Sequence, residues 1–158
     1  MNDDFRKHLD LIQGVINRMA GNSFSVKTWA VGLITVLGGL AAKDSNPRLS
    51  CALLFPAICF WWMDAYYLRQ EKLFRKLYVK VVDSDPKTKL YSLDTSPFSS
   101  EVMSLRKVAF SPTVRWLHFP ILLFVIGLIV YSFGGFSRHH APGSALPAPT
   151  VVSKPPSQ

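Results

Sequence analysis

The chain has 158 residues and a formal net charge of +8, with 49% hydrophobic and only 18% charged residues. Soluble domains carry about 25% charged residues, and here three stretches (28–42, 49–63 and 116–137) contain no Asp, Glu, Lys or Arg at all. A membrane-spanning helix needs about 20 mostly apolar residues. The composition argues against a soluble globular enzyme and predicts an all-α integral membrane protein with three transmembrane helices.

Residues 1–22 predict an amphipathic cytoplasmic helix. Apolar side chains recur at helical spacing from Phe5 to Met19, and Gly21-Asn22 is a typical helix stop because both residues tolerate the left-handed conformation. The apolar stripe has three interpretations. It packs on the protein's other cytoplasmic segment, lies in the headgroup plane, or self-associates as a short coiled coil.

The first two transmembrane helices are predicted at residues 24–42 and 49–67, with a tight outside turn between them. Their uncharged cores are short, so a re-entrant hairpin is the alternative to two full crossings. Trp and Tyr gather at bilayer interfaces, and their placement at the segment ends favours crossing. Gly38 and Ala42 lie four residues apart in the first segment, a spacing that lets helices approach closely in lipid.

The central region, 68–115, is expected in the cytoplasm. It predicts a helical extension of the second span at 68–82, a loop at 83–99 and a short helix at 100–109. No Gly or Pro interrupts the extension. Within the loop the pattern over residues 89–93 fits a short strand, and Ser99 or Ser100 is expected to cap the short helix.

The third transmembrane helix is predicted at residues 116–136. Ser111-Pro112 is a typical cap and first-turn pair that would start it, and Pro120 is expected to kink it. The remaining residues, 137–158, are rich in Pro, Ser and Ala and poor in large apolar side chains. They predict a disordered extracytoplasmic tail.

The distribution of basic residues predicts the orientation. Ten of the eighteen Lys and Arg residues lie between the second and third spans, and four lie in the N-terminal arm up to and including Lys27. Cytoplasmic loops carry an excess of Lys and Arg. We therefore expect a multi-pass protein of the bacterial inner membrane with a cytoplasmic N-terminus and an extracytoplasmic C-terminus. The early acidic residues Asp3, Asp4 and Asp10 do not fit a secretory signal peptide.

Asp64 is the residue whose placement in a membrane is most costly. A carboxylate in lipid costs about 2.5–3.5 kcal/mol at mid-membrane and less near the edge, so Asp64 should face the bundle and have a partner. Lys27 lies at the matching depth on the first span, which predicts an Asp64–Lys27 pair. The pair is either a structural bridge that fixes how two spans dock, or a gate, proton site or ligand-coupled switch.

A basic cluster follows the second span directly. Juxtamembrane clusters of this kind bind anionic lipid headgroups; the alternatives are a soluble anion such as a nucleotide, and a partner protein. Glu71 precedes Arg75 by four residues, the favourable order for a helix ion pair. The cluster consists of Arg69, Lys72, Arg75, Lys76 and Lys80.

The sequence offers no candidate catalytic residue, metal site or cofactor site. Cys51 and Cys59 have neither metal-ligand nor redox spacing, and His139-His140 has no further ligands nearby. His118 is interpreted as an interface residue of the third span. We expect no enzyme activity, no cofactor and no direct binding to nucleic acid, since the positive charge is accounted for by membrane orientation.

Two motifs carry a resemblance. N-R-M-A-x-N-S-F-x-x-K-x-W at 17–29 and F-W-x-x-D-A-Y-Y-L-x-x-E-x-x-F-R-x-L-Y at 60–78 are similar to a family of small bacterial membrane proteins with no assigned activity. Some of its members are associated with antiviral defence or nucleotide-signalling genes, which implies a membrane effector role. Besides Asp64, Lys27 and Arg75, the resemblance nominates Asn22, Trp29, Tyr66, Tyr67, Glu71 and Phe74.

The leading functional hypothesis is a self-assembling membrane effector that responds to a cytoplasmic signal or partner. Its expected partners are anionic lipids and either further copies of the chain or a cytoplasmic protein. Its motivation is the pair of amphipathic cytoplasmic segments, which need something to cover them. The alternatives are a non-catalytic membrane anchor or scaffold for a soluble partner, and an accessory transport subunit that uses Asp64.

Overall fold

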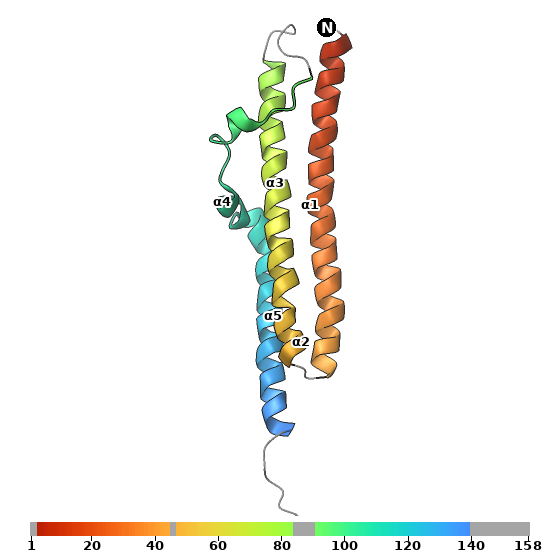
Figure 1. The fold of residues 1–158 in the computed structure, drawn as a ribbon, viewed down its shortest axis with the longest axis vertical. Coiled ribbons are helices and arrows are strands. Elements are labelled where there is room, and N and C mark those ends of the chain that lie inside the picture. The colour runs from red at the N-terminus through yellow and green to blue at the C-terminus, as the bar shows by residue number, and fades with distance from the viewer. Residues whose placement is uncertain (1–2, 45–46, 84–90, 140–158) are drawn as a thin grey trace, which may run out of the picture.

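The computed structural model describes residues 3–44, 47–83 and 91–139, and every regular element in these ranges is helical. Three helices are long and apolar enough to cross a membrane, in agreement with the predicted class. Figure 1 shows α1 and α3 side by side along their length, with α5 against the lower half of α3. The elements are α1 (Asp3–Lys43), α2 (Pro47–Ala52), α3 (Leu54–Val82), the 3-10 helix η1 (Ser96–Phe98), α4 (Leu105–Ala109) and α5 (Pro112–His139).

Helix α1 is a single element of 41 residues, so the predicted helix stop at Gly21-Asn22 is wrong. The buried residues of α1 continue at helical spacing on both sides of this point, from Phe5 to Ala41. The same face of the helix therefore packs on its neighbours throughout. Glycine inside a helix costs about 1 kcal/mol relative to alanine, and packing along this continuous face offsets that local preference.

The upper parts of α1 and α3, residues 3–22 and 68–82, form a two-helix unit that we call the stalk. Its core contains Ile12 and Ile16 of α1 together with Leu73 and Leu77 of α3. Phe98 of η1 closes the same core from the side. Of the three interpretations of the N-terminal stripe, the structure shows the first, in which the stripe packs on another segment of the same chain.

Replacing Ile12 with alanine is expected to destabilise the stalk by about 2–5 kcal/mol, because deletion of a fully buried aliphatic side chain leaves a cavity. Ile12 is 0% exposed, whereas its neighbour Leu11 is 50% exposed. Leu11→Ala is therefore the matched control and should change stability by less than about 0.5 kcal/mol. Limited proteolysis in mild detergent measures the difference. Equal protection of both variants would contradict this packing.

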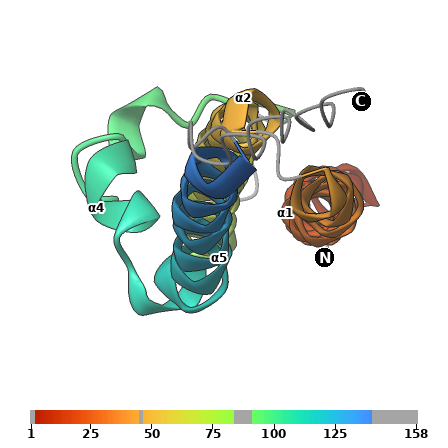
Figure 2. The same ribbon diagram turned by 90° about the horizontal axis from the view of Figure 1, so that it is seen from below.

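The lower half of the molecule is the apolar bundle, which comprises residues 23–43 of α1, residues 47–67 of α2 and α3, and α5. Its core joins Ile34 and Ala41 of α1, Leu53 and Ala57 of the second segment, and Val125 of α5. Figure 2 shows the same three long helices from below. Near the end remote from the stalk, the hydroxyls of Ser50 and Ser132 lie 2.8 Å apart in a buried contact.

A short interruption at Leu53 separates α2 from α3. Proline has no N–H, and its ring clashes with the carbonyl four residues before it. Pro56 therefore disturbs the helix at Ala52, and the backbone N–H of Leu53 is shared between the carbonyls of Leu49 and Ser50, at 3.3 Å each. Beyond this point α3 continues to Val82, which confirms the predicted helical extension of the second span.

The segment between α3 and α5 differs in detail from its prediction. The short helix begins at Leu105, after Ser104, and not at residue 100 with Ser99 or Ser100 as the cap. The preceding residues instead form η1 and turns, because Phe98 and Val102 insert into the stalk core. Residues 91–93 are not a strand, and the rest of the strand prediction, 89–90, lies outside the described residues, as does 84–90 of the predicted loop.

Helix α5 begins at Pro112, as predicted, and continues without interruption through Pro120. It extends to His139, so the first residues of the predicted disordered tail, 137–139, are helical. The remainder of that prediction, 140–158, lies outside the described residues. Within the bundle, α5 approaches α1 closely at Gly38. A Cβ added to Gly38 would lie 3.0 Å from Cε1 of Phe124.

Candidate functional site

Four polar side chains from the three long helices meet where the stalk joins the apolar bundle. Ser23 and Lys27 come from successive turns of α1, Asp64 from α3, and His118 from α5. Residues four apart lie on the same face of a helix, so α1 presents Ser23 and Lys27 together to Asp64. We call this group the junction network.

The Asp64 carboxylate is the centre of the junction network. Its Oδ1 atom accepts a hydrogen bond from Ser23 Oγ at 2.5 Å and an ion-paired hydrogen bond from Lys27 Nζ. Its Oδ2 atom lies 3.1 Å from His118 Nε2. Lys27 Nζ also donates to Ser23 Oγ at 2.7 Å. Both carboxylate oxygens are therefore occupied, and each neighbouring helix supplies at least one partner.

Burial divides the junction network into a sealed part and an accessible part. The side chains of Asp64 and His118 are 0% and 1% exposed, whereas that of Lys27 is 25% exposed. The lysine stem can follow apolar surface while its ammonium group approaches polar surroundings. Lys27 is therefore the member through which the network reaches the outside of the bundle.

The protonation pattern of His118 follows from its contacts. The contact with an ionised Asp64 fits the tautomer in which Nε2 carries the proton, and Nδ1 is buried without a hydrogen-bond partner among the described residues. A neutral imidazole leaves only an unused lone pair at Nδ1, whereas a charged imidazolium would leave a buried N–H unsatisfied. The geometry therefore fits a neutral histidine beside a Lys–Asp pair.

Trp61 fixes the orientation of the His118 ring. The two rings are stacked, with centroids 6.1 Å apart and an interplanar angle of 3°. The indole Nε1 donates to the carbonyl of Ala109 at 2.9 Å, and Phe110 meets the indole edge-on at 5.6 Å. The short helix α4 and the residue after it thus lock the tryptophan against the junction network.

The arrangement lacks the features of a hydrolytic site. The Ser23 hydroxyl donates to the carboxylate and not to the imidazole, so the Ser–His pair of a serine hydrolase is not formed. Within the described ranges no group of three or more His, Cys, Asp or Glu side chains could hold a metal ion. What the network can do chemically is hold helices in register and exchange the partners of one buried carboxylate.

The sequence pointed to half of the junction network. The structure brings Lys27 and Asp64 together, as the cost argument predicted, but it adds Ser23 and His118. Ser23 could have been found from its position one turn before Lys27, inside the same motif. His118 could have been found from its depth, since it lies near the start of the third span as Asp64 lies near the end of the second.

The basic cluster on α3 is largely engaged within the chain. Arg69 donates to the carbonyls of Met103 and Ser99 at 3.2 and 3.4 Å. Lys76 lies 3.5 Å from Glu101, and Lys80 lies over the ring of Phe98 at 5.2 Å. Arg75 pairs with Glu71 at 2.7 Å. For Lys72 the structure shows only a partly buried side chain.

The other residues nominated by the resemblance are not brought to the junction network. Phe74 packs against the stalk core, and Asn22 is partly buried. Trp29 is 70% exposed and Tyr66 48% exposed. The rings of Tyr66 and its neighbour Tyr67 form an edge-on contact at 5.6 Å.

Comparison of the chain with protein-family models, with curated proteins and with solved structures found no match. The resemblance inferred from the two motifs therefore stays a prediction.

Proposed function

We propose that this protein is a multi-pass component of the bacterial inner membrane that acts as a membrane effector. In this proposal the stalk stands in the cytoplasm, receives a signal or partner, and changes the arrangement of the apolar bundle. The large apolar side chains exposed on the bundle support its residence in lipid. Examples are Trp29 at 70%, Phe55 at 76% and Val130 at 68% exposure, and exposure of so much apolar surface to water is unfavourable.

The observation that carries the proposal is the continuity of α1 and α3 through the junction network. Both helices run from the stalk into the bundle without a break at this level. Ser23, Lys27 and Asp64 tie the two rods together, and His118 ties them to α5. Because packed helices have discrete arrangements, a displacement in the stalk would change which partners Asp64 retains.

Membrane permeabilisation would require several copies of the chain. The core of one bundle is apolar apart from the junction network and the Ser50–Ser132 contact in the part described. Such a core offers no polar lining for ions. Self-assembly is therefore part of the proposal, with the lipid-exposed faces of the bundle as the surfaces through which copies would meet.

The structure weakens one motivation for a docked partner. The two amphipathic stripes of the stalk cover each other, so a partner is not needed to bury them. A soluble partner would have to bind the outer, polar faces of the stalk. The anchor or scaffold alternative requires the same faces, and the experiment below separates the two functions.

The proposal is tested by expressing the full chain in bacterial cells and following membrane potential with a voltage-sensitive dye. Asp64→Asn removes the charge of the network, and Asp44→Asn is its matched control, because Asp44 is exposed at the end of α1. We expect depolarisation that depends on expression and is altered by Asp64→Asn but not by Asp44→Asn. Unchanged potential together with a stoichiometric soluble partner would replace the effector by the anchor.

A further inference from the structure

Two adjoining hollows run along α5 from the level of the junction network into the bundle. The first measures 390 Å³ and is lined by Arg115, Trp116, Phe119 and Pro120. The second measures 350 Å³, lies between α1 and α5, and also has Pro120 in its wall. Its other lining residues are Val31, Ile34, Thr35, Ile121 and Phe124. Pro120 lies in the wall of both hollows, which are therefore neighbours, and we refer to the pair as the groove.

The groove is open at one end and closed at the other. At its closed end α1 and α5 touch, since a Cβ on Gly38 would lie 3.0 Å from Phe124 and 3.1 Å from Leu128. At its open end stands Arg115 at the start of α5. From Arg115 to Phe124 the helix rises by about 14 Å, which matches roughly one leaflet of a hydrocarbon core about 30 Å thick.

The groove is charged at its mouth and apolar along its length. No ion pair of Arg115 occurs in the described part of the chain, and its neighbour Trp116 is 79% exposed. Trp at this position is typical of the membrane interface. A guanidinium group binds phosphate oxygens in two parallel hydrogen bonds. The occupant should therefore be an amphiphile with an anionic phosphate head.

We propose that this groove binds one anionic phospholipid, with its phosphate on Arg115 and one acyl chain between α1 and α5. A second copy of the chain is a poorer occupant, because it carries a formal net charge of +8 and would approach an unpaired arginine. The inference requires that the chain lies in a bilayer, but it does not depend on the effector function. Loss of lipid binding and loss of depolarisation are separate results.

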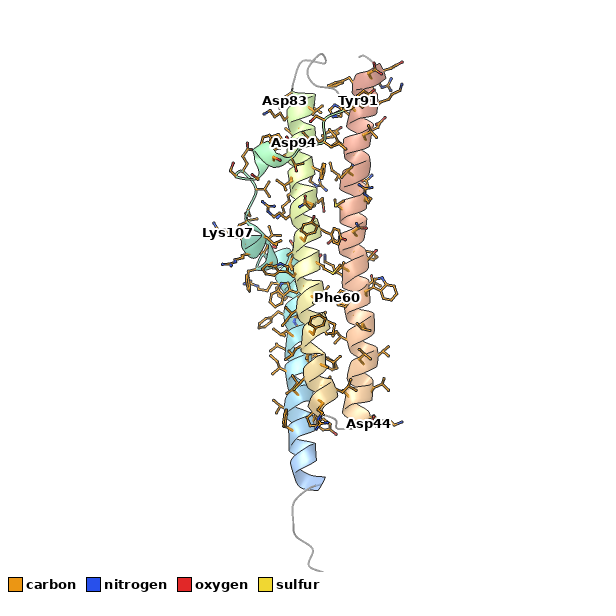
Figure 3. All side chains as sticks on the ribbon, in the orientation of Figure 1. Asp44, Phe60, Asp83, Tyr91, Asp94 and Lys107 are labelled. Carbon is orange, nitrogen blue, oxygen red and sulfur yellow. The ribbon has the colours of Figure 1, made fainter. Side chains whose placement is uncertain are left out.

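The headgroup contact is tested by native mass spectrometry of the full chain, purified in mild detergent and titrated with phosphatidylglycerol. We expect one tightly bound lipid per chain, and a loss of affinity of about five-fold in Arg115→Gln, as for one basic residue near a membrane surface. Lys107→Gln is the matched control, because Lys107 lies on α4 (Figure 3) and is not among the residues that line the groove. Equal affinity in the two variants would overturn the proposal.

The acyl-chain contact has its own pair of variants. Thr35→Phe fills the groove between α1 and α5, whereas Val36→Phe places the same ring on a side chain that is 64% exposed and outside the groove. We expect the bound lipid to be lost in Thr35→Phe only. Retention in both variants would overturn the proposal, as would displacement by inorganic phosphate alone. Cross-links between copies of a Thr35→Cys variant that are absent from the unsubstituted chain would overturn the proposal and assign the groove to a second chain.

Discussion

Replacing Asp64 with alanine is expected to destabilise the three-helix bundle by about 3–5 kcal/mol, the usual effect of removing one partner from a buried ion pair. The carboxylate accepts from Ser23, Lys27 and His118. Its removal takes away the acceptor that these three donors share at the junction of stalk and bundle, and it leaves the Lys27 charge without a counter-charge in the junction network. The loss should appear as an earlier transition when the protein is unfolded with denaturing detergent from a mild detergent micelle.

An exposed ion pair on the same helix provides the control for this prediction. Arg75 pairs with Glu71 at 2.7 Å, but its side chain is 63% exposed. Exposed pairs four residues apart contribute about 0.3–0.5 kcal/mol, so Arg75→Gln should barely move the transition. If Asp64→Ala and Arg75→Gln unfold alike, the junction network does not hold the three helices together.

Replacing Gly38 with valine is expected to separate α1 from α5, whereas the same change at Gly39 should be tolerated. A Cβ at Gly38 would meet Phe124 at 3.0 Å and Leu128 at 3.1 Å, while nothing lies within 4 Å of a Cβ at Gly39. Overpacking of a close contact costs about 1–3 kcal/mol. Both variants have the same helix propensity, so their difference reports the contact between helices.

The difference between the two glycine variants can be measured by the same detergent unfolding and by cysteine cross-linking between α1 and α5. Gly38→Val should unfold earlier and cross-link less efficiently than Gly39→Val. Identical behaviour would show that α1 and α5 do not approach at Gly38. The prediction would then fail together with the closed end of the proposed lipid groove.

The features that could be predicted are those that depend on the sequence of one segment alone. The three apolar helices follow from runs of uncharged residues, and the unbroken α3 follows from the lack of Gly and Pro between Pro56 and Pro86. The need of Asp64 for a partner follows from the cost of a carboxylate in lipid. Lys27 could be predicted as that partner because the first two spans are antiparallel neighbours and the two residues lie at the same depth.

The features that were missed depend on contacts between segments. Gly21-Asn22 has the composition of a helix stop, but one face of α1 is buried both before and after these two residues. A rule based on local sequence does not include that packing. His118 enters the junction network through the rotation of α5 about its own axis, and sequence spacing does not fix that rotation. The basic cluster is interpreted from the sequence as a surface for anionic lipid, yet Arg69, Lys76 and Lys80 turn toward residues 96–104 because η1 packs beside them.

The pairing of Lys27 with Asp64 has a consequence for biogenesis. Lys27 and Asp64 belong to α1 and α3, which are synthesised before α5, so their charges can neutralise each other as soon as these two helices pair. The third segment then brings His118, whose imidazole completes the carboxylate's hydrogen bonds. The order of synthesis thus lets the carboxylate and the ammonium group meet before α5 completes the bundle.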